Sequence, residues 1–218
     1  MNIPNLIQNP LFNGLNENEL SQLLKCLNPR LQSYQKNETI IKNNDSLHEI
    51  GILISGEANI VRYDYWGNSS IITHLYSGEV FGEAYACIPE NEVDINVIAT
   101  ENCQILFLDV FKIATACPCA CSFHHLIIKN LLAMIAKKNI ILNKKVDLMA
   151  KKTIREKVLA YLSSQALISN SKIFNIPYNR NQLAEYLGVD RSALSSELSK
   201  MQKDGLISYY RNTFKLLI

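Results

Sequence analysis

Residues 179–194, Asn-Arg-Asn-Gln-Leu-Ala-Glu-Tyr-Leu-Gly-Val-Asp-Arg-Ser-Ala-Leu, decide the fold of the C-terminal part of the chain. The segment 181–189 predicts a short helix that turns at Gly188, and Asp190 is a natural N-cap for a second helix. The inner face of that second helix carries Leu194, Leu198 and Met201. Two helices joined by a short turn containing Gly form a helix-turn-helix, whose second helix enters the major groove of DNA. The stretch therefore predicts a DNA-binding element.

The residues around this stretch support the same prediction. Residues 206–210 and 213–217 flank Arg211-Asn212 and predict a two-stranded wing. Residues 151–218 carry 11 Lys and Arg against 5 Asp and Glu (net +6), whereas residues 1–150 carry 11 against 15 (net −4). A basic C-terminal third indicates a polyanionic partner, although a merely solvated basic surface has the same composition. We expect a winged helix-turn-helix domain over residues 150–218, with double-stranded DNA as its partner.

Residues 122–149 predict one long helix with a regular apolar repeat. Seven positions follow one another at alternating steps of 4 and 3 residues: Ile128, Leu132, Ile135, Asn139, Leu142, Val146 and Met149. An average step of about 3.5 residues is typical of a coiled-coil seam, and a polar Asn139 would fix the register of a parallel pair. We expect a parallel homodimer through this seam. The alternative is a helix packed on its own domain, because Leu131, Ile140 and Ile141 make other faces apolar.

The N-terminal half begins with a helix and continues as short strands. Asn16 and Glu19 approximate a capping box, and the helix that follows has a stripe of Leu20, Leu23, Leu24 and Leu27. From residue 31 to residue 109 the segments are short and rich in β-branched residues, and Gly56, Gly67 and Gly78 recur at intervals of 11. Turn signals at this spacing are typical of an antiparallel sandwich or barrel. We expect an α+β chain whose residues 1–121 form an N-terminal helix and an antiparallel β-roll.

This order of elements resembles the Crp–Fnr family of bacterial transcription regulators, over essentially the whole chain. The most specific likenesses are residues 77–83, Ser-Gly-Glu-Val-Phe-Gly-Glu, which are similar to the family's Gly-x-x-Phe-Gly-Glu segment, and residues 179–194. Residues 201–207 also resemble the family's C-terminal pattern. The resemblance implies a jelly-roll sensor domain of the cyclic-nucleotide-binding type and a cytoplasmic, non-enzymatic regulator. Such a regulator acts as a homodimer on a roughly palindromic promoter site, and RNA polymerase is a partner if it is an activator.

The resemblance also implies roles in DNA recognition. Arg191 is the candidate for a bidentate contact to guanine, or alternatively for a phosphate contact. In the family a Glu follows this Arg and a second Arg comes five residues after it, whereas this chain has Ser192 and Ser196, so its operator should differ. Phosphate contacts are expected from Arg180, Lys200 and Arg211. The expected interface consists of Arg180, Asp190, Arg191, Ser192, Ser195, Ser196, Lys200 and Arg211.

The effector site implied by the resemblance consists of Phe81, Gly82, Glu83, Val93 and Asp94. In members that bind cyclic nucleotides, an Arg-Ser pair follows the Glu of the Phe-Gly-Glu segment by ten and eleven residues and holds the phosphate. Here those positions are Val93 and Asp94. The change removes a planar guanidinium and places a carboxylate where an anion would lie. We therefore expect no binding of cyclic AMP in the family's way, and we expect Gly82 and Glu83 to close a turn.

The six cysteines indicate reduced thiols in a cytoplasmic protein. Cys26, Cys87 and Cys103 have apolar neighbours and are expected to be small core residues. The first of them lies within a helix, and there is no N-terminal group of cysteines like the one that holds the iron–sulfur cluster of the family's oxygen-sensing branch. A second group consists of Cys117, Cys119, Cys121, His124 and His125. We expect it to carry no cofactor; a soft metal, redox sensing, or haem at Cys117-Pro118 are the alternatives.

Two other function classes compete with a DNA-binding regulator. A cupin-like metal enzyme would need a cluster of His ligands within the strands, and His48 and His74 do not form one; nor is there a Ser-His-Asp set or a phosphate-binding Gly loop. A cyclic-nucleotide-type ligand-binding module would have no use for residues 151–218. No apolar run of about 18 residues and no basic-then-apolar start is present, so we expect neither a membrane span nor a secretory signal.

Overall fold

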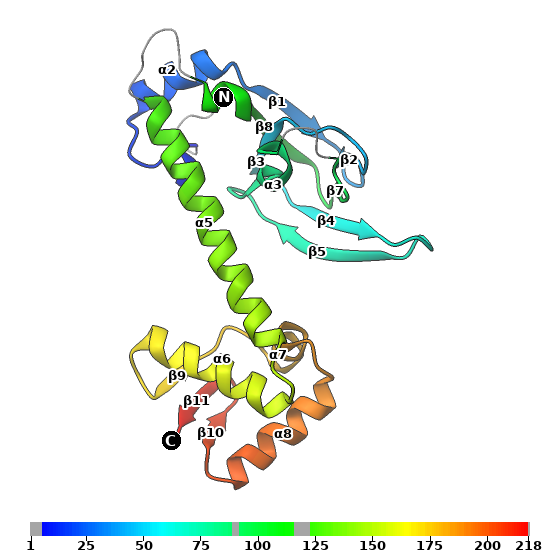
Figure 1. The fold of residues 1–218 in the computed structure, drawn as a ribbon, viewed down its shortest axis with the longest axis vertical. Coiled ribbons are helices and arrows are strands. Elements are labelled where there is room, and N and C mark those ends of the chain that lie inside the picture. The colour runs from blue at the N-terminus through cyan, green and yellow to red at the C-terminus, as the bar shows by residue number, and fades with distance from the viewer. Residues whose placement is uncertain (1–5, 89–91, 116–122, 218) are drawn as a thin grey trace. The chain divides into compact units, whose positions relative to one another are not determined.

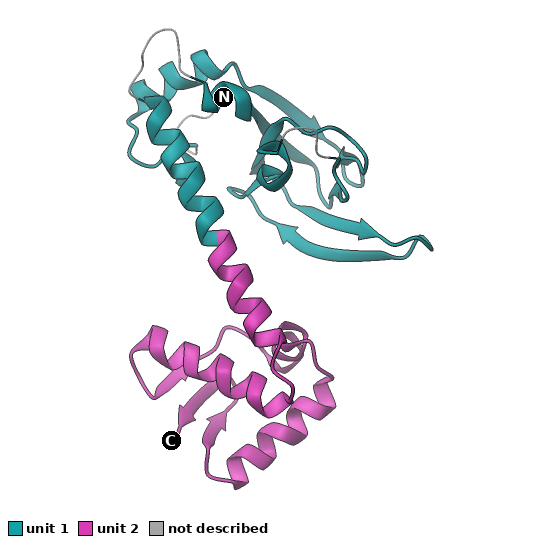
Figure 2. Ribbon diagram, viewed as in Figure 1, with its two compact units in different colours: residues 1–137 teal, residues 138–218 magenta. Residues whose placement is uncertain are grey.

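A computed structural model of the chain describes residues 6–88, 92–115 and 123–217 (Figure 1). The chain divides into two compact units, residues 1–137 and residues 138–218 (Figure 2). The division falls inside the long helix α5 (Phe123–Met149), so the segment expected as a separate dimerisation helix contributes residues to both units. None of the described helices is long and apolar enough to cross a membrane.

Unit 1 is an antiparallel β-roll with helices, as the sequence predicts. One sheet has the order β1-β8-β3-β6 and the other the order β2-β7-β4-β5. The helices are η1 (Pro10–Phe12), α2 (Glu17–Leu27), α3 (Glu83–Ala86), α4 (Val110–Ala114) and the first part of α5. The strands are β1 (Arg30–Tyr34), β2 (Thr39–Ile41), β3 (Glu49–Ser55), β4 (Ala58–Tyr63), β5 (Ser69–Leu75), β6 (Val80–Phe81), β7 (Asn96–Ala99) and β8 (Cys103–Asp109).

The two central strands of the first sheet, β3 and β8, are buried on both faces, which explains their nearly continuous apolar runs. Ile105 and Phe107 of β8 belong to a core cluster shared with residues of the second sheet. Leu106 and Leu108, which alternate with them, pack in a different cluster with the leucines of α2 and with Ile127 of α5. The start of α5 and α2 are therefore fixed against the same side of the roll.

The capping prediction for α2 is confirmed. The Asn16 side chain accepts a hydrogen bond from the Glu19 amide at 3.0 Å, and the Glu19 carboxylate accepts one from the Asn16 amide at 2.9 Å. The hairpin between β4 and β5 turns at Gly67, whose φ of +84° lies in the left-handed region that glycine adopts readily. The hairpin tip exposes Tyr65 and Trp66.

Unit 2 is a winged helix-turn-helix built on its own core. It contains α6 (Ile154–Ser169), α7 (Arg180–Leu187), α8 (Arg191–Lys203) and a three-stranded antiparallel sheet of order β10-β11-β9. The strands are β9 (Ile173–Asn175), β10 (Ile207–Tyr210) and β11 (Thr213–Leu216). The core cluster combines Leu148 from the end of α5 with the inner faces of all three helices and with Phe214. Leu194, Leu198 and Met201 of α8 are buried, as predicted.

Candidate DNA-binding surface and sensor sites

The start of α8 is fixed by its N-cap. The Asp190 side chain accepts hydrogen bonds from the Ala193 amide at 2.9 Å and from the Ser192 hydroxyl at 2.5 Å. The Ser192 hydroxyl, with these backbone amides, holds the pKa of the Asp190 carboxyl below its usual range. The hydroxyl of Ser192 is thus already used inside the cap, which leaves Arg191 as the charged side chain at the exposed start of α8.

The outer face of α8 is small, polar and basic. Its exposed residues are Arg191, Ser192, Ser195, Ser196, Ser199, Lys200, Gln202 and Lys203. The hydroxyls of Ser195 and Ser199 donate to the carbonyl oxygens of Arg191 and Ser195, each at 3.0 Å, so two serines satisfy their hydrogen bonds within the helix. Short side chains let the helix backbone approach a groove closely, while the Arg and Lys side chains reach outward.

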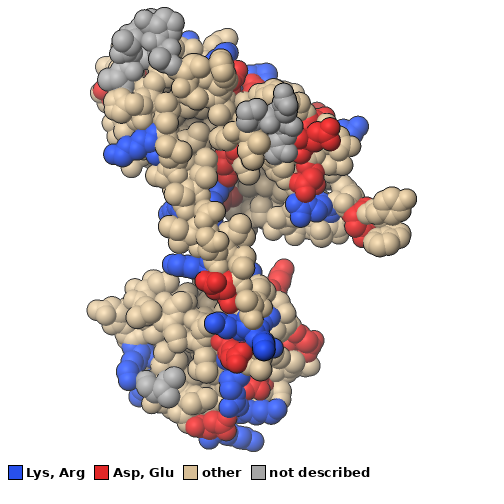
Figure 3. All heavy atoms as spheres, in the orientation of Figure 1, with Lys and Arg blue, Asp and Glu red and all other residues tan. Residues whose placement is uncertain are grey.

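One arginine of α6 pairs with two acidic groups, one within α8 and one at its C-terminal end. Arg155 pairs with Glu197 at 2.6 Å and with Asp204 at 2.8 Å, and these contacts raise the pKa of its guanidinium. Glu197 is the one acidic residue within α8, so the charges left on the outer face of this helix are positive. Figure 3 shows basic side chains predominating along the lower edge of unit 2.

Arg180 does not lie on the surface as a free phosphate ligand would. Its guanidinium is half-buried over the rings of Tyr209 and Phe214, at 4.7 and 5.1 Å from their centroids. One nitrogen donates to the carbonyl oxygen of Arg211 at 3.0 Å, and burial lowers the pKa of the group. Arg211 lies at the turn of the wing and has a φ of +52°. Because Arg180 donates to its carbonyl oxygen, Arg180 holds that turn in place. Arg211 itself is exposed, as a phosphate contact requires.

Two lysines donate hydrogen bonds to the backbone carbonyl oxygens at the C-terminal end of α7. Lys145 of α5 donates to the carbonyl oxygen of Tyr186 and lies 3.8 Å from the centroid of the Tyr186 ring, and burial lowers its pKa. Lys157 of α6 donates to the carbonyl oxygen of Leu187 at 3.1 Å. Ammonium groups at the C-terminal carbonyls of a helix complement its dipole. The first helix of the helix-turn-helix is thus bound to the last turns of α5.

Most of the residues expected for the effector site are packed in the fold and are not exposed. Phe81 and Val93 are each 1% exposed and belong to the core between the two sheets. A Cβ atom at Gly51 would overlap the Phe81 ring, so that ring lies directly against β3. Gly82 has a φ of +81° and begins α3, and Glu83 is buried in the first turn of that helix, which fits the predicted turn. Val93 therefore has no access to a phosphate.

Asp94 is exposed and already has partners. The Tyr85 hydroxyl of α3 donates to its carboxylate, and Arg62 of β4 pairs with it at 2.9 Å. The Tyr85 hydrogen bond, together with Arg62, holds the pKa of the Asp94 carboxyl below its usual range. Asp94 is therefore a carboxylate at neutral pH, and it is already paired with Arg62.

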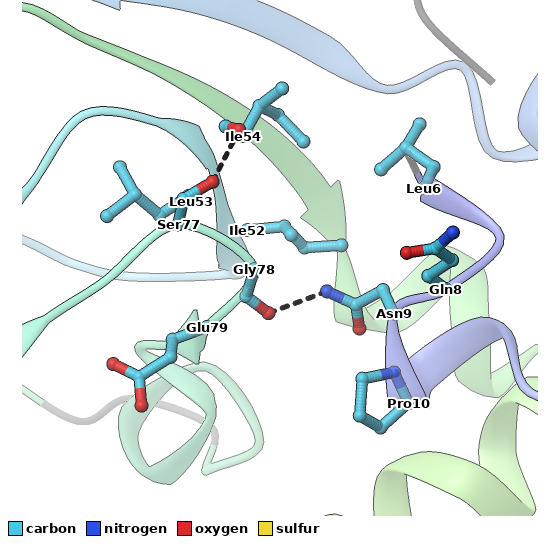
Figure 4. A pocket seen from close by; sticks show the side chains of 10 residues that line it. All are labelled: Leu6, Gln8, Asn9, Pro10, Ile52, Leu53, Ile54, Ser77, Gly78 and Glu79. Carbon is cyan, nitrogen blue, oxygen red and sulfur yellow. Dashed lines mark hydrogen bonds between the residues drawn. The ribbon is translucent and has the colours of Figure 1, made fainter. Parts of the chain in front are cut away.

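Sequence reasoning did not identify a cavity that lies on the other side of the first sheet. The cavity has a volume of about 450 Å³ and is lined by residues at and before the start of η1, by β3 and by the turn before β6 (Figure 4). Asn9 points to the Gly78 carbonyl oxygen and donates to it at 2.8 Å. The described lining contains the carboxylate of Glu79 and no Lys or Arg, which does not suit an anionic ligand.

The predicted Cys and His cluster lies partly outside the described residues, which exclude Cys117, Cys119 and Cys121. His124 is 6% exposed, its Nε2 lies 4.0 Å from the Cys26 sulfur, and His125 is exposed. Within the described parts of the chain, no group of three or more His, Cys, Asp or Glu residues could hold a metal ion. The expectation that three cysteines are core residues is wrong for Cys26 and Cys87, which are exposed, and correct for Cys103.

The predicted seam is exposed along its middle. Leu132, Leu142 and Val146 are 62%, 60% and 57% exposed, whereas Ile127 and Leu131 on another face of α5 are buried in unit 1. Asn139, also in the seam, accepts a hydrogen bond from Asn143 at 2.8 Å. Other seam residues contact the chain itself: Ile128 and Ile135 pack on the core of unit 1, and Met149 packs on the core of unit 2.

Comparisons with known proteins match both units. The model of the cyclic nucleotide-binding domain family matches residues 31–116, and that of the Crp-like helix-turn-helix domain matches residues 156–218. The chain is 24% identical over 201 residues to the cyclic AMP receptor protein of Thermus thermophilus, covering 91% of this chain and 88% of the relative. It is 24% identical over 199 residues to electron transport regulator A of Shewanella oneidensis, covering 88% and 76%. The solved catabolite activator protein of Thermus thermophilus has the same fold, with a TM-score of 0.56 and 23% identity over 95% of this chain and 93% of that one.

Proposed function

Because this chain belongs to the Crp–Fnr family of transcription regulators, we propose that it binds an inverted-repeat promoter site as a homodimer and responds to an effector other than cyclic AMP. Crp-like regulators are not enzymes, and we assign no catalytic residue. If the protein is an activator, RNA polymerase is its further partner.

The outer face of α8 supports the DNA-binding half of this proposal most strongly. The helix begins at a firm cap, its acidic residue is paired with Arg155, and its exposed charges are Arg191, Lys200 and Lys203. A helix that presents cations and short polar side chains fits the major groove, where Arg pairs with guanine. We assign base contacts to Arg191 and Ser196, and phosphate contacts to Lys200 and Arg211. Arg180 becomes a positioning residue for the wing.

The exposed seam of α5 supports the proposed homodimer. Three large aliphatic side chains at seam positions, Leu132, Leu142 and Val146, are each more than half exposed in the single chain. A second α5 helix packed in parallel would remove them from water, and Asn139 would then face its counterpart and set the register. A two-fold symmetric pair presents two α8 helices, which requires two half-sites about one helical turn of DNA apart.

The exclusion of cyclic AMP rests on Val93 and Asp94. A buried valine and an ion-paired carboxylate offer no donor to a cyclic phosphate at the positions where the family's nucleotide-binding members place Arg and Ser. The name of the Thermus relative therefore does not identify the effector of this chain.

The proposal is tested by selecting duplexes from a random DNA pool with the purified full-length protein. We expect enrichment of an inverted repeat, and we expect the Arg191→Ala variant to enrich it less strongly and with a relaxed base preference. The matched control is Lys203→Ala, which removes an exposed cation from the other end of α8. If the wild-type chain enriches no common sequence, the proposal of sequence-specific regulation is wrong.

A further inference from the structure

The last turns of α5 contact the helix-turn-helix, and both belong to unit 2 (Figure 2). Lys145 of α5 lies between the seam residues Leu142 and Val146. Its ammonium donates to the carbonyl oxygen of Tyr186, near the end of α7. We propose that Lys145 is a positioning residue that fixes the spacing between the two operator half-sites, an inference that rests on the proposed homodimer and its inverted-repeat site.

The ring of Tyr186 gives the Lys145 ammonium a fixed partner. The Lys145 nitrogen lies 3.8 Å from the centroid of this ring, so one cation contacts both the π-face and the backbone carbonyl of the same residue. The Tyr186 ring also lies 5.0 Å from the ring of Tyr178 and 5.3 Å from that of Tyr161. Because packing against two further rings limits the movement of Tyr186, its contact with Lys145 fixes the orientation of α7 relative to the end of α5.

A second contact joins the same two segments about one helical turn further along α5. Gly188, the C-cap of α7, has a φ of +60°, and a Cβ atom at this position would lie 3.3 Å from the sulfur of Met149. The turn between α7 and α8 therefore lies directly against the last seam residue. Residues 150–153, which link α5 to α6, are all exposed. An exposed linker does not by itself fix an angle between helices, so the side chains at the end of α5 set the orientation of the helix-turn-helix.

This orientation decides which half-site spacing a dimer can bind. In a two-fold pair the seam holds the two α5 helices together, so the separation and angle of the two α8 helices follow from how each is attached to its own α5. Moving one half-site by one base pair shifts it by about 3.4 Å along the duplex and rotates it by about 34–36°. A rigid attachment does not follow such a shift, whereas a loose attachment accommodates it.

Lys157 makes a similar contact without involving α5. It lies in α6, and its ammonium donates to the carbonyl oxygen of Leu187 at 3.1 Å. Burial, and then the charge of Lys157, lowers the pKa of Lys145, so removal of Lys157 leaves the Lys145 ammonium in place. Lys144 precedes Lys145 in α5 and is exposed. These two lysines are therefore matched controls for Lys145.

The test uses the full-length protein and the half-site selected from the random DNA pool. Fluorescence anisotropy at one salt concentration measures binding to a single half-site and to inverted repeats whose centre is shortened or lengthened by one or two base pairs. The wild type should bind its best spacing about tenfold or more tightly than a spacing one base pair away, because a misplaced half-site loses the intramolecular second contact. Lys145→Met keeps an unbranched apolar stem and removes the ammonium. It should reduce this preference to about threefold or less and change single half-site affinity by less than about twofold.

Lys144→Met and Lys157→Met should keep the wild-type spacing preference. Circular dichroism and ultracentrifugation check the fold and the dimer of each variant, and Lys145→Gln replaces Lys145→Met if the latter does not fold or dimerise. A wild-type spacing preference in Lys145→Met, or equal weakening of the single half-site and of every repeat, would overturn the inference. A wild type that binds a single half-site without preferring any spacing would overturn it too, while leaving sequence-specific DNA binding intact. Failure of the wild type to bind any of the duplexes would contradict the proposed function itself, and this inference with it.

Discussion

Arg180 and Arg191 occupy equivalent places in the sequence, each at the first position of one helix of the helix-turn-helix. The structure gives them different environments: Arg180 is half-buried against Tyr209 and Phe214, while Arg191 is exposed. Charge alone assigned both to DNA. Exposure and hydrogen bonding separate a side chain that organises the wing from one that can reach a base.

Replacing Arg191 with Ala should reduce affinity for the selected operator by about 1–3 kcal/mol and relax preference at one base pair, because a bidentate guanine contact is lost. Binding is measured by fluorescence anisotropy on the operator and on a scrambled duplex. Lys200→Ala serves as the comparison. Loss of a phosphate contact should weaken binding to both duplexes equally. It should also reduce the slope of log affinity against log salt concentration by about one. If Arg191→Ala weakens binding to both duplexes equally, Arg191 contacts a phosphate and not a base.

Replacing Arg180 with Ala should lower the free energy of unfolding of the protein by about 1–2 kcal/mol, because a cation–π contact and a hydrogen bond to a backbone carbonyl disappear together. Thermal and urea unfolding measure the change. Arg211→Gln is the control, since it leaves the carbonyl oxygen that Arg180 uses and should alter stability little. A destabilisation by Arg211→Gln as large as that by Arg180→Ala would show that the Arg211 side chain, rather than its carbonyl, supports the wing.

Calorimetry should detect no saturable binding of cyclic AMP up to about 1 mM, the range where binding free energy falls to about −4 kcal/mol. Installing the family's pair as Val93→Arg with Asp94→Ser should not restore binding, because an Arg at a position that is 1% exposed places an unpaired charge in the core between the sheets. We expect this double variant to be less stable than Asp94→Ser alone. Micromolar affinity of the wild type would mean that other residues hold the phosphate.

At the scale of elements, α5 has two apolar faces, one buried in unit 1 and the other exposed. Ile127 and Leu131 are buried in unit 1, while the seam residues Leu132, Leu142 and Val146 remain exposed. Leu132→Asp and Leu142→Asp should each convert a dimer to a monomer in analytical ultracentrifugation, because a charge would be buried in the seam. Ile141→Asp is the control: Ile141 is 58% exposed and lies off the repeat. Dimers that persist in both seam variants would place the interface elsewhere.

Elements with strong local signals were predictable from the sequence. Asn16 and Asp190 cap their helices as expected, and Gly67 turns the hairpin. The short elements β6, α3, α4 and β9 were not predicted, because each has two to five residues and depends on tertiary contacts more than on a periodic pattern. The contact between Cys26 and His124 spans 98 residues and leaves no local signature.

At the scale of the whole molecule, α5 contributes residues to both units. Its first half shares a core with α2 and the roll, and its last turns carry Leu148 into the core of unit 2 and Lys145 onto the end of α7. A seam along such a helix would pair two copies of unit 1 and two copies of unit 2 at once. Dimerisation and operator binding should therefore be coupled.

The coupling predicts how affinity depends on the number of half-sites. A dimer that engages both halves of an inverted repeat should bind it about 10²–10⁴-fold more tightly than a duplex with one half-site, because the second contact is intramolecular. The Leu142→Asp monomer should bind both duplexes with nearly the affinity of a single half-site, and Ile141→Asp should retain the wild-type ratio. Anisotropy titrations at one fixed salt concentration measure this, since phosphate contacts make every affinity salt-dependent. A monomeric Leu142→Asp protein that still prefers the full repeat would show that the two α8 helices are paired on DNA by contacts outside the seam.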